Sequence, residues 1–201
     1  NKRTLENKYI KLLNENAEYP TVLENILKTS DTNMNKLNSK GRPLFFDSIL
    51  NFNFKLFKLL RTKSININEK DQDGNNIIFR LMDYDNKDLI KDKKLYLNTI
   101  KSLINSGVDI NAKNNESLTA LHLAVGGKCE YTIRLLLEMR ADCTITDNKG
   151  RTIMHTCIWK NTTKYFKLIY NYNKEIINIP DLFGIRPINY AAFMGKKDLV
   201  I

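Results

Sequence analysis

The sequence has few cysteines and no long apolar run, and both shortages narrow the class of protein. Its 201 residues include three cysteines, Cys129, Cys143 and Cys157, an odd and sparse count that argues against a disulfide framework and favours a reducing compartment. No stretch approaches the roughly 18 consecutive apolar residues of a membrane-spanning helix, and no signal peptide is visible. We therefore expect a cytoplasmic protein, either of the cell that makes it or of a host cell that it enters. Because the chain opens at Asn1 and not at a methionine, we expect it to be a fragment.

Motifs of catalysis are missing as well. The sequence contains no G-x-S-x-G, no Walker phosphate loop and no pair of carboxylates at a convincing spacing. The segment Gly126-Gly127-Lys128 lacks the rest of a phosphate loop, so we interpret it as a turn that ends a helix. We expect Cys143 to be exposed on a hairpin, but no base or cation is placed to lower the pKa of its thiol. The sequence predicts neither an enzyme nor a bound cofactor.

The chain has a large net positive charge, but its basic residues are not clustered in the sequence. A net charge of +10 and an isoelectric point of about 9.4 would favour acidic partners, including nucleic acid. However, the lysines are scattered among Asp and Glu, and no basic run of five or more residues occurs. The richness in Asn and Ile is typical of an AT-rich genome, which also explains many of the lysines. Nucleic-acid or anionic-surface binding therefore stays an alternative function.

What the sequence does contain is an internal repeat. A turn residue followed by a short apolar helix recurs at spacings of 33, 43, 33 and 34 residues, and the turn residues are Gly41, Gly74, Ser117, Gly150 and Gly184. The longer spacing is explained by the polar insertion Asp83–Asn98, which we expect to add helical turns. An alternation of Asp or Asn with apolar residues precedes the later turns, and leucine-rich helices such as Thr132–Met139 follow. A single helix pair cannot bury both of its faces, so neighbouring units must stack.

This unit resembles the ankyrin repeat. The best match is Asn114–Arg140, with its SLTALHLAV and TIRLLLEM segments, whereas Phe46 and Phe79 stand where the family has histidine. The resemblance implies an all-α fold, an ankyrin-repeat α-solenoid of stacked helix-turn-helix units with projecting hairpin loops, in one array over residues 1–201. The expected units are 1–31 (degenerate), 32–64, 65–107 with the insertion 83–98, 108–140, 141–174 and a truncated 175–201.

The resemblance also implies roles for the repeated Thr and His residues. The threonine and histidine of each T-x-x-H would exchange hydrogen bonds at the start of the first helix, and the imidazole would reach the backbone of the adjacent unit. The structural residues expected on this basis are Thr119, His122, Thr152, His155, Gly41, Gly74, Gly150 and Gly184. A zinc site made from His155, Cys157, Cys143 and Cys129 is the alternative, which we disfavour because residues two apart on a helix diverge.

Ankyrin arrays bind other proteins through their hairpin tips and the inner face of each first helix. Carried over to this chain, those positions become aromatic and basic toward the C-terminus. The hypothesised partner-binding residues are Lys149, Arg151, Trp159, Lys160, Leu182, Phe183, Phe193 and Met194. We expect a non-enzymatic interaction scaffold or adaptor, of which a host-directed effector is one form, and a partner that combines acidic groups with apolar anchors. The alternatives are that these aromatic residues pack against neighbouring units, or that the array is the targeting arm of a larger enzyme.

Overall fold

The computed structural model describes residues 35, 37, 40–50, 65–83 and 93–197. The chain divides into two compact units, Asn1–Arg80 and Leu81–Ile201. In the described ranges the regular structure consists of eight α-helices and a 3-10 helix, with one isolated β-bridge between Leu37 and Pro43 and no longer strand. No helix within these ranges is long and apolar enough to cross a membrane. The helices expected in residues 1–31 and 51–64 lie outside the described residues.

The described part of the first unit contains α3, Leu44–Leu50, and the start of α5, Ile77–Asp83. Phe45 and Phe46 are completely buried and meet edge to face, with ring centroids 4.9 Å apart. The turn before each helix has a glycine in the left-handed region, with φ of 68° at Gly41 and 77° at Gly74. A side chain at Gly41 would also collide with Gln72, since an added Cβ would lie 2.2 Å from its Cδ atom. The left-handed backbone therefore favours glycine at position 41, and a Cβ there would also displace the flexible end of the Gln72 side chain.

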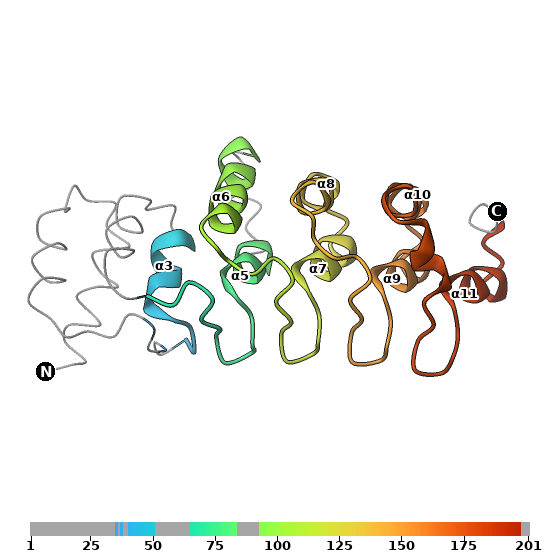
Figure 1. Cartoon of the computed structure of the whole chain (residues 1–201), viewed down its shortest axis with the longest axis horizontal. Helices are drawn as coiled ribbons and strands as arrows, with labels where there is room; N and C mark the ends of the chain where they lie inside the picture. The colour runs from blue at the N-terminus through green and yellow to red at the C-terminus, as the bar shows by residue number, and fades with distance from the viewer. Residues whose placement is uncertain (1–34, 36, 38–39, 51–64, 84–92, 198–201) are drawn as a thin grey trace, which may run out of the picture. The chain divides into compact units, whose positions relative to one another are not determined.

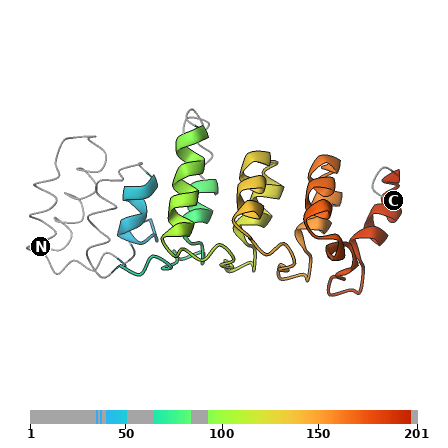
Figure 2. The same cartoon turned by 45° about the horizontal axis from the view of Figure 1, so that its top comes forward.

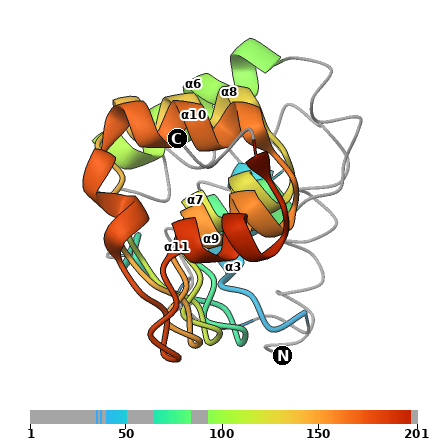
Figure 3. The same cartoon turned by 90° about the vertical axis from the view of Figure 1, so that its right-hand side faces the viewer.

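The second unit alternates short and long helices (Figure 1). In chain order they are α6 (Lys93–Asn105), α7 (Ala120–Gly126), α8 (Glu130–Glu138), α9 (Ile153–Trp159), α10 (Thr163–Tyr172), η2 (Lys174–Asn178) and α11 (Pro187–Phe193). Helices α6, α8 and α10 run side by side (Figure 2). Viewed along the stack, they overlap in one layer while α7, α9 and α11 overlap in a second, and the connecting hairpins all project to the same side (Figure 3). Successive helix pairs are thus related by translation.

The layer in which a helix lies explains how its apolar residues are distributed. Helix α8 buries Thr132, Ile133, Leu136 and Leu137, which share one face of a helix. In the other layer, α7 buries five of its seven residues, Ala120, Leu121, His122, Ala124 and Val125. A helix packed between two neighbours and a covering layer has little exposed surface. This is why α7 and α9 are apolar nearly all round, whereas α8 is amphipathic.

Two local expectations are confirmed and one is wrong. Gly127 ends α7, and the amides of Lys128 and Cys129 donate to the carbonyls of Val125 and Ala124, so this segment is a helix-ending turn. The insertion does add helical turns, because its residues 93–98 form the start of α6; residues 84–92 lie outside the described ranges. Cys143, however, is buried, with only 2% of its surface exposed. The exposed tip of its hairpin lies further along, at residues 148–149, while Cys143 is at its base.

Candidate docking surface

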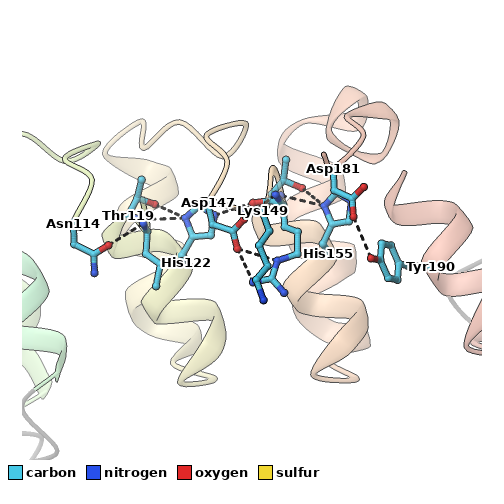
Figure 4. Close-up of polar contacts among 11 residues, drawn as sticks. Asn114, Thr119, His122, Asp147, Lys149, His155, Asp181 and Tyr190 are labelled. Carbon is cyan, nitrogen blue, oxygen red and sulfur yellow. Dashed lines mark hydrogen bonds and ion pairs between the residues drawn. The ribbon is translucent and has the colours of Figure 1, made fainter. Parts of the chain in front are cut away.

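Each hairpin of the second unit is built around one side-chain oxygen. Oδ1 of Asp147 accepts hydrogen bonds from the amides of Lys149 (2.8 Å) and Arg151 (2.9 Å). Oδ1 of Asp181 accepts from the amides of the residues two and four positions later, at 2.9 and 3.0 Å, and Oδ1 of Asn114 does the same in its hairpin, at 3.0 and 3.0 Å. Figure 4 shows Asn114, Asp147 and Asp181 at their places in three successive hairpins. The hairpins therefore hold their shape without a ligand.

The second oxygen of the carboxylate binds a different group in each hairpin. Oδ2 of Asp147 accepts from Nε (2.9 Å) and Nη2 (2.7 Å) of Arg151, whereas Oδ2 of Asp181 accepts from the hydroxyl of Tyr190 (3.1 Å). Burial disfavours the charged form of both carboxyls, but the hydrogen bonds that they accept together outweigh it and lower the pKa of each below its usual value. The arginine side chain is consequently held in a defined position on the hairpin.

Both histidines are fully engaged in structural hydrogen bonds. Nδ1 of His122 accepts from the amide of Thr119 (3.2 Å), so its Nε2 carries the proton and donates to the carbonyl of Arg151 (3.4 Å). His155 repeats this arrangement with Thr152 (3.1 Å) and the carbonyl of Ile185 (3.1 Å). Each imidazole thereby links the start of its own helix to the next hairpin, so neither has a ring nitrogen for a metal or a proton-transfer step.

Burial explains the titration of these side chains. Desolvation, the largest influence, lowers the pKa of His122 to about 4 and also lowers that of His155. Burial raises the pKa of the Cys157 thiol to about 12 and raises that of Cys143 as well. The structure does not bring the cysteines and His155 together, and the part of the chain that it describes has no group of three potential metal ligands.

Adjacent hairpins are joined through their backbones. The amide of Asn148 donates to the carbonyl of Glu116 (3.3 Å), and the amide of Leu182 donates to the carbonyl of Lys149 (3.1 Å). Leu182 lies directly against Gly150, since a Cβ there would be 2.6 Å from its amide nitrogen. Gly150 also has a φ of 74°, which lies in the left-handed region that glycine adopts without strain. The hairpins thus form a continuous ladder along this edge of the unit.

Trp159 is the largest apolar side chain that this edge leaves exposed. At the end of α9, 63% of its surface is accessible, and the guanidinium of Arg151 lies 5.6 Å from its ring centroid. A cation over an aromatic face is attracted by the negative charge on that face. The same guanidinium is anchored by Asp147, so hairpin and helix together hold the exposed ring in place.

The other hypothesised binding residues are also exposed, but fewer contacts connect them. The exposed fractions of Leu182, Phe183, Phe193 and Met194 are 74%, 79%, 90% and 42%. Lys149 and Lys160 are exposed, and neither ammonium pairs with a carboxylate among the described residues. The structure therefore brings Arg151 and Trp159 together and leaves Phe193 without a ring partner in the described part. We refer to the eight residues Lys149, Arg151, Trp159, Lys160, Leu182, Phe183, Phe193 and Met194 as the docking surface.

The sequence reasoning did not identify Asp147 and Asp181 as the residues that organise this edge. Their signal is visible in the sequence, because each stands three residues before the turn glycine, at positions 150 and 184. An aspartate three residues before a left-handed glycine commonly caps its own turn through the backbone amides that follow it. The partners of their second oxygen, Arg151 and Tyr190, follow no common spacing and are visible only in the structure.

These features define a helical repeat protein, in which stacked helix pairs present a ladder of preformed hairpins. Residues 88–181 match the model of a family described as ankyrin repeats (3 copies). Residues 88–181 of the chain therefore consist of ankyrin repeats, and the described residues have the all-α fold of such an array.

Several differently named proteins are similar in sequence to this chain. The chain is 29% identical over 107 residues to the probable 26S proteasome regulatory subunit p28 of Saccharomyces cerevisiae, covering 52% of this chain and 47% of that protein. It is 35% identical over 102 residues to the B-cell lymphoma 3 protein homolog of Mus musculus, covering 50% and 22%. It is 36% identical over 69 residues to the putative ankyrin repeat protein FPV219 of Fowlpox virus, covering 33% and 16%. The chain spans less than half the length of each of these relatives.

Proposed function

We propose that this chain is a non-enzymatic scaffold that binds another protein through the docking surface. Ankyrin repeats generally mediate interactions between proteins, and the regulatory subunit among the relatives is in keeping with an adaptor role. The observation that carries the proposal is the exposed ring of Trp159, held under a guanidinium that is itself fixed by Asp147. An ordered aromatic side chain loses little conformational freedom on binding, and Trp and Arg are enriched among residues that dominate binding energy.

The charges of the docking surface favour an acidic partner with apolar anchors. On α8 and α10, the exposed cations Arg134 and Lys164 are neutralised by Glu130. By contrast, Lys149 and Lys160 have no such partner in the described ranges, and Lys160 directly follows the exposed Trp159. Acidic groups on a partner would supply the missing complement, while Trp159 and Phe183 would take its apolar side chains. We propose the cytoplasm as the compartment, since the described cysteines are free thiols.

The test is an affinity measurement with single variants. Proteins captured by the 201-residue chain from extracts are identified, and the equilibrium constant of each is measured for the chain and for Trp159→Ala. We expect at least about a tenfold loss of affinity, because truncating a central aromatic anchor commonly has such an effect. Tyr172→Ala is the matched control, since this exposed aromatic residue lies on α10, in the layer that bears no hairpins, and should leave affinity within about twofold.

Two other outcomes would replace the proposal. Equal affinities for the chain and Trp159→Ala, with both folded by circular dichroism, would show that the partner binds elsewhere. Binding of nucleic acid that falls steeply with salt and does not depend on Trp159 would favour the anionic-surface function suggested by the net charge of +10. If the same partner binds a longer polypeptide that contains this array and has catalytic activity, the array would instead be the targeting arm of an enzyme.

A further inference from the structure

The charged residues on the helices of the second unit gather in one layer. Helices α7 and α9 contain no Asp, Glu, Lys or Arg. Helices α6, α8 and α10 together contain two carboxylates, those of Glu130 and Glu138, against six cations. The cations are Lys93, Lys94, Lys101, Arg134, Lys164 and Lys167. The lysines are scattered along the sequence, but the fold thus collects a positive excess on the layer that bears no hairpins (Figure 3).

Three of these cations occupy the same position in successive helices. Lys101, Arg134 and Lys167 are spaced by 33 residues, the period of the repeat. The residue before each cation and the residue two positions after it are at most 2% exposed. These buried residues are Ile100, Leu103, Ile133, Leu136, Phe166 and Ile169. Because the same positions of each helix face the core, the three cations point outward in the same direction from helices that lie side by side (Figure 2). We call Lys101, Arg134 and Lys167 the cation row.

The cation row is accessible in all three helices. The side chain of Arg134 is 52% exposed, although α8 has α6 on one side and α10 on the other. Lys101 and Lys167 are exposed as well, so the exposure of this position does not depend on which helix comes next. Arg134 forms an ion pair with Glu130 (2.9 Å), whereas no ion pair joins Lys101 or Lys167 to a carboxylate in the described ranges. The row therefore carries positive charge that the described residues only partly neutralise.

Two carboxylates make the row narrow. On α8, Glu130 and Glu138 stand four residues before and four residues after Arg134, on the same face of the helix. A DNA duplex carries one negative charge per about 1.7 Å of its axis, so a duplex laid over Arg134 would also bring phosphates close to these carboxylates. A single acidic segment that crosses the helices at the row would avoid that repulsion. The arrangement thus favours an acidic protein segment over a duplex.

The spacing of the row matches an α-helix. Packed helices lie about 8–10 Å apart, so neighbouring cations of the row are separated by about this distance. Residues seven positions apart on an α-helix share a face and are about 10.5 Å apart, because the rise is about 1.5 Å per residue. Carboxylates at positions i, i+7 and i+14 of one helix would therefore each face one cation.

We propose that the cation row binds an acidic helix of another protein, laid across α6, α8 and α10. One carboxylate of that helix pairs with each of Lys101, Arg134 and Lys167. Complementary charges across such an interface fix the register of the partner and speed its association. The cation row shares no residue with the docking surface, and the inference does not depend on the proposed function.

A designed peptide tests the proposal. The probe is a 16-residue helical peptide of alanine and glutamine with glutamates at positions 1, 8 and 15, titrated into the 15N-labelled 201-residue chain at low salt. We expect saturable shifts of the amides of Lys101, Arg134 and Lys167. The dissociation constant should be of about the millimolar order and should rise with salt, because exposed ion pairs are individually weak and are screened. A peptide of the same composition with glutamates at positions 1, 6 and 11, which point in three directions, should bind at least about threefold more weakly.

Protein variants separate the cation row from net charge and from the docking surface. The double variant Lys101→Glu and Lys167→Glu is expected to weaken peptide binding at least about tenfold, because attraction becomes repulsion at two of the three positions. The matched control is Lys149→Glu with Lys160→Glu, which changes the net charge equally on the docking surface and should leave binding within about twofold. A failure of the proposed function would not alter either result, because the probe is not the partner of the docking surface.

Several outcomes would overturn the inference. They are the absence of any saturable shift, shifts that gather on the docking surface, equal binding of the two peptides, and equal binding by the chain and the Lys101→Glu, Lys167→Glu variant. A single-stranded or duplex DNA probe that binds more tightly than the peptide, and loses its binding in this variant, would show that the row serves nucleic acid instead.

Discussion

The repeats that contain α9 and α11 share their turn geometry but differ in what covers them. Gly150 and Gly184 both have a φ of 74°, and each follows an aspartate that caps its turn. Yet Gly150 is in contact with Leu182, whereas no described residue lies within 4 Å of where a Cβ on Gly184 would be. His155 and Ile158 are buried, whereas Asn189 and Ala192 at the matching positions are exposed. Backbone conformation in these repeats is therefore a local property, while burial depends on the neighbouring unit.

Alanine at the two glycines gives the largest expected contrast. Both substitutions force a Cβ into the left-handed region, at about 1–2 kcal/mol. At Gly150 the Cβ would also lie 2.6 Å from the amide nitrogen of Leu182, and overpacking adds about 1–3 kcal/mol. We expect Gly150→Ala to lower the free energy of unfolding in urea clearly more than Gly184→Ala does. Equal losses would mean that the two hairpins are not distinguished by their neighbour.

Acid is expected to have the next largest effect, and to act on the covered repeats. The pKa of His122 is about 4 when folded, against 6.5 for an ordinary histidine. As the pH falls through this window the unfolded chain takes up the proton first, so stability present at neutral pH is lost and the loss levels off below about pH 4. A shift of this size corresponds to about 3 kcal/mol. His155, whose pKa is also lowered, acts in the same direction.

The urea midpoint at pH 7 and at pH 4.5 measures this effect. The control is His122→Asn, which introduces the residue type that α11 already has at the matching position. The variant should be less stable at pH 7 but should lose less stability on acidification. The capping carboxyls do not account for the loss above pH 4.5, because the pKa values of Asp147 and Asp181 are lowered and their contribution disappears at more acidic pH. An unchanged pH dependence in the variant would contradict the assignment to His122.

The smallest expected effects come from the capping aspartates. Asn114 shows that an amide oxygen caps a hairpin equally well, so Asp147→Asn should keep both backbone hydrogen bonds. It would lose the partly exposed ion pair with Arg151, at about 1 kcal/mol. Asp181→Asn should be milder, because its second oxygen accepts only from the Tyr190 hydroxyl. Urea unfolding measures both, and the fluorescence of Trp159 should respond to Asp147→Asn alone. A larger loss for Asp181→Asn would contradict this order.

Much of the fold could be predicted because its signals are local. The recurring turn residues marked left-handed positions, including Ser117, whose φ is 60°. The apolar spacing of Thr132–Met139 predicted the amphipathic helix α8. The burial of Cys143 was not predictable in this way, because it depends on the neighbouring segment, where Asn173 hydrogen bonds to its thiol. The contact of Arg151 with Asp147 and Trp159 was likewise missed, since a long side chain has several partners within reach.

The sequence by itself determined the turns, because each follows from residues a few positions apart, and it determined the period, because the same turn pattern recurs along the chain. A glycine that tolerates left-handed backbone and an aspartate three residues before it shape a hairpin without help from distant residues. Only the tertiary structure decided which of these equivalent positions are covered by a neighbouring repeat. Burial depends on the contacts between repeats. Gly150 and Gly184 have the same local sequence pattern, but Gly150 is in contact with a neighbouring repeat, whereas Gly184 has no such contact among the described residues.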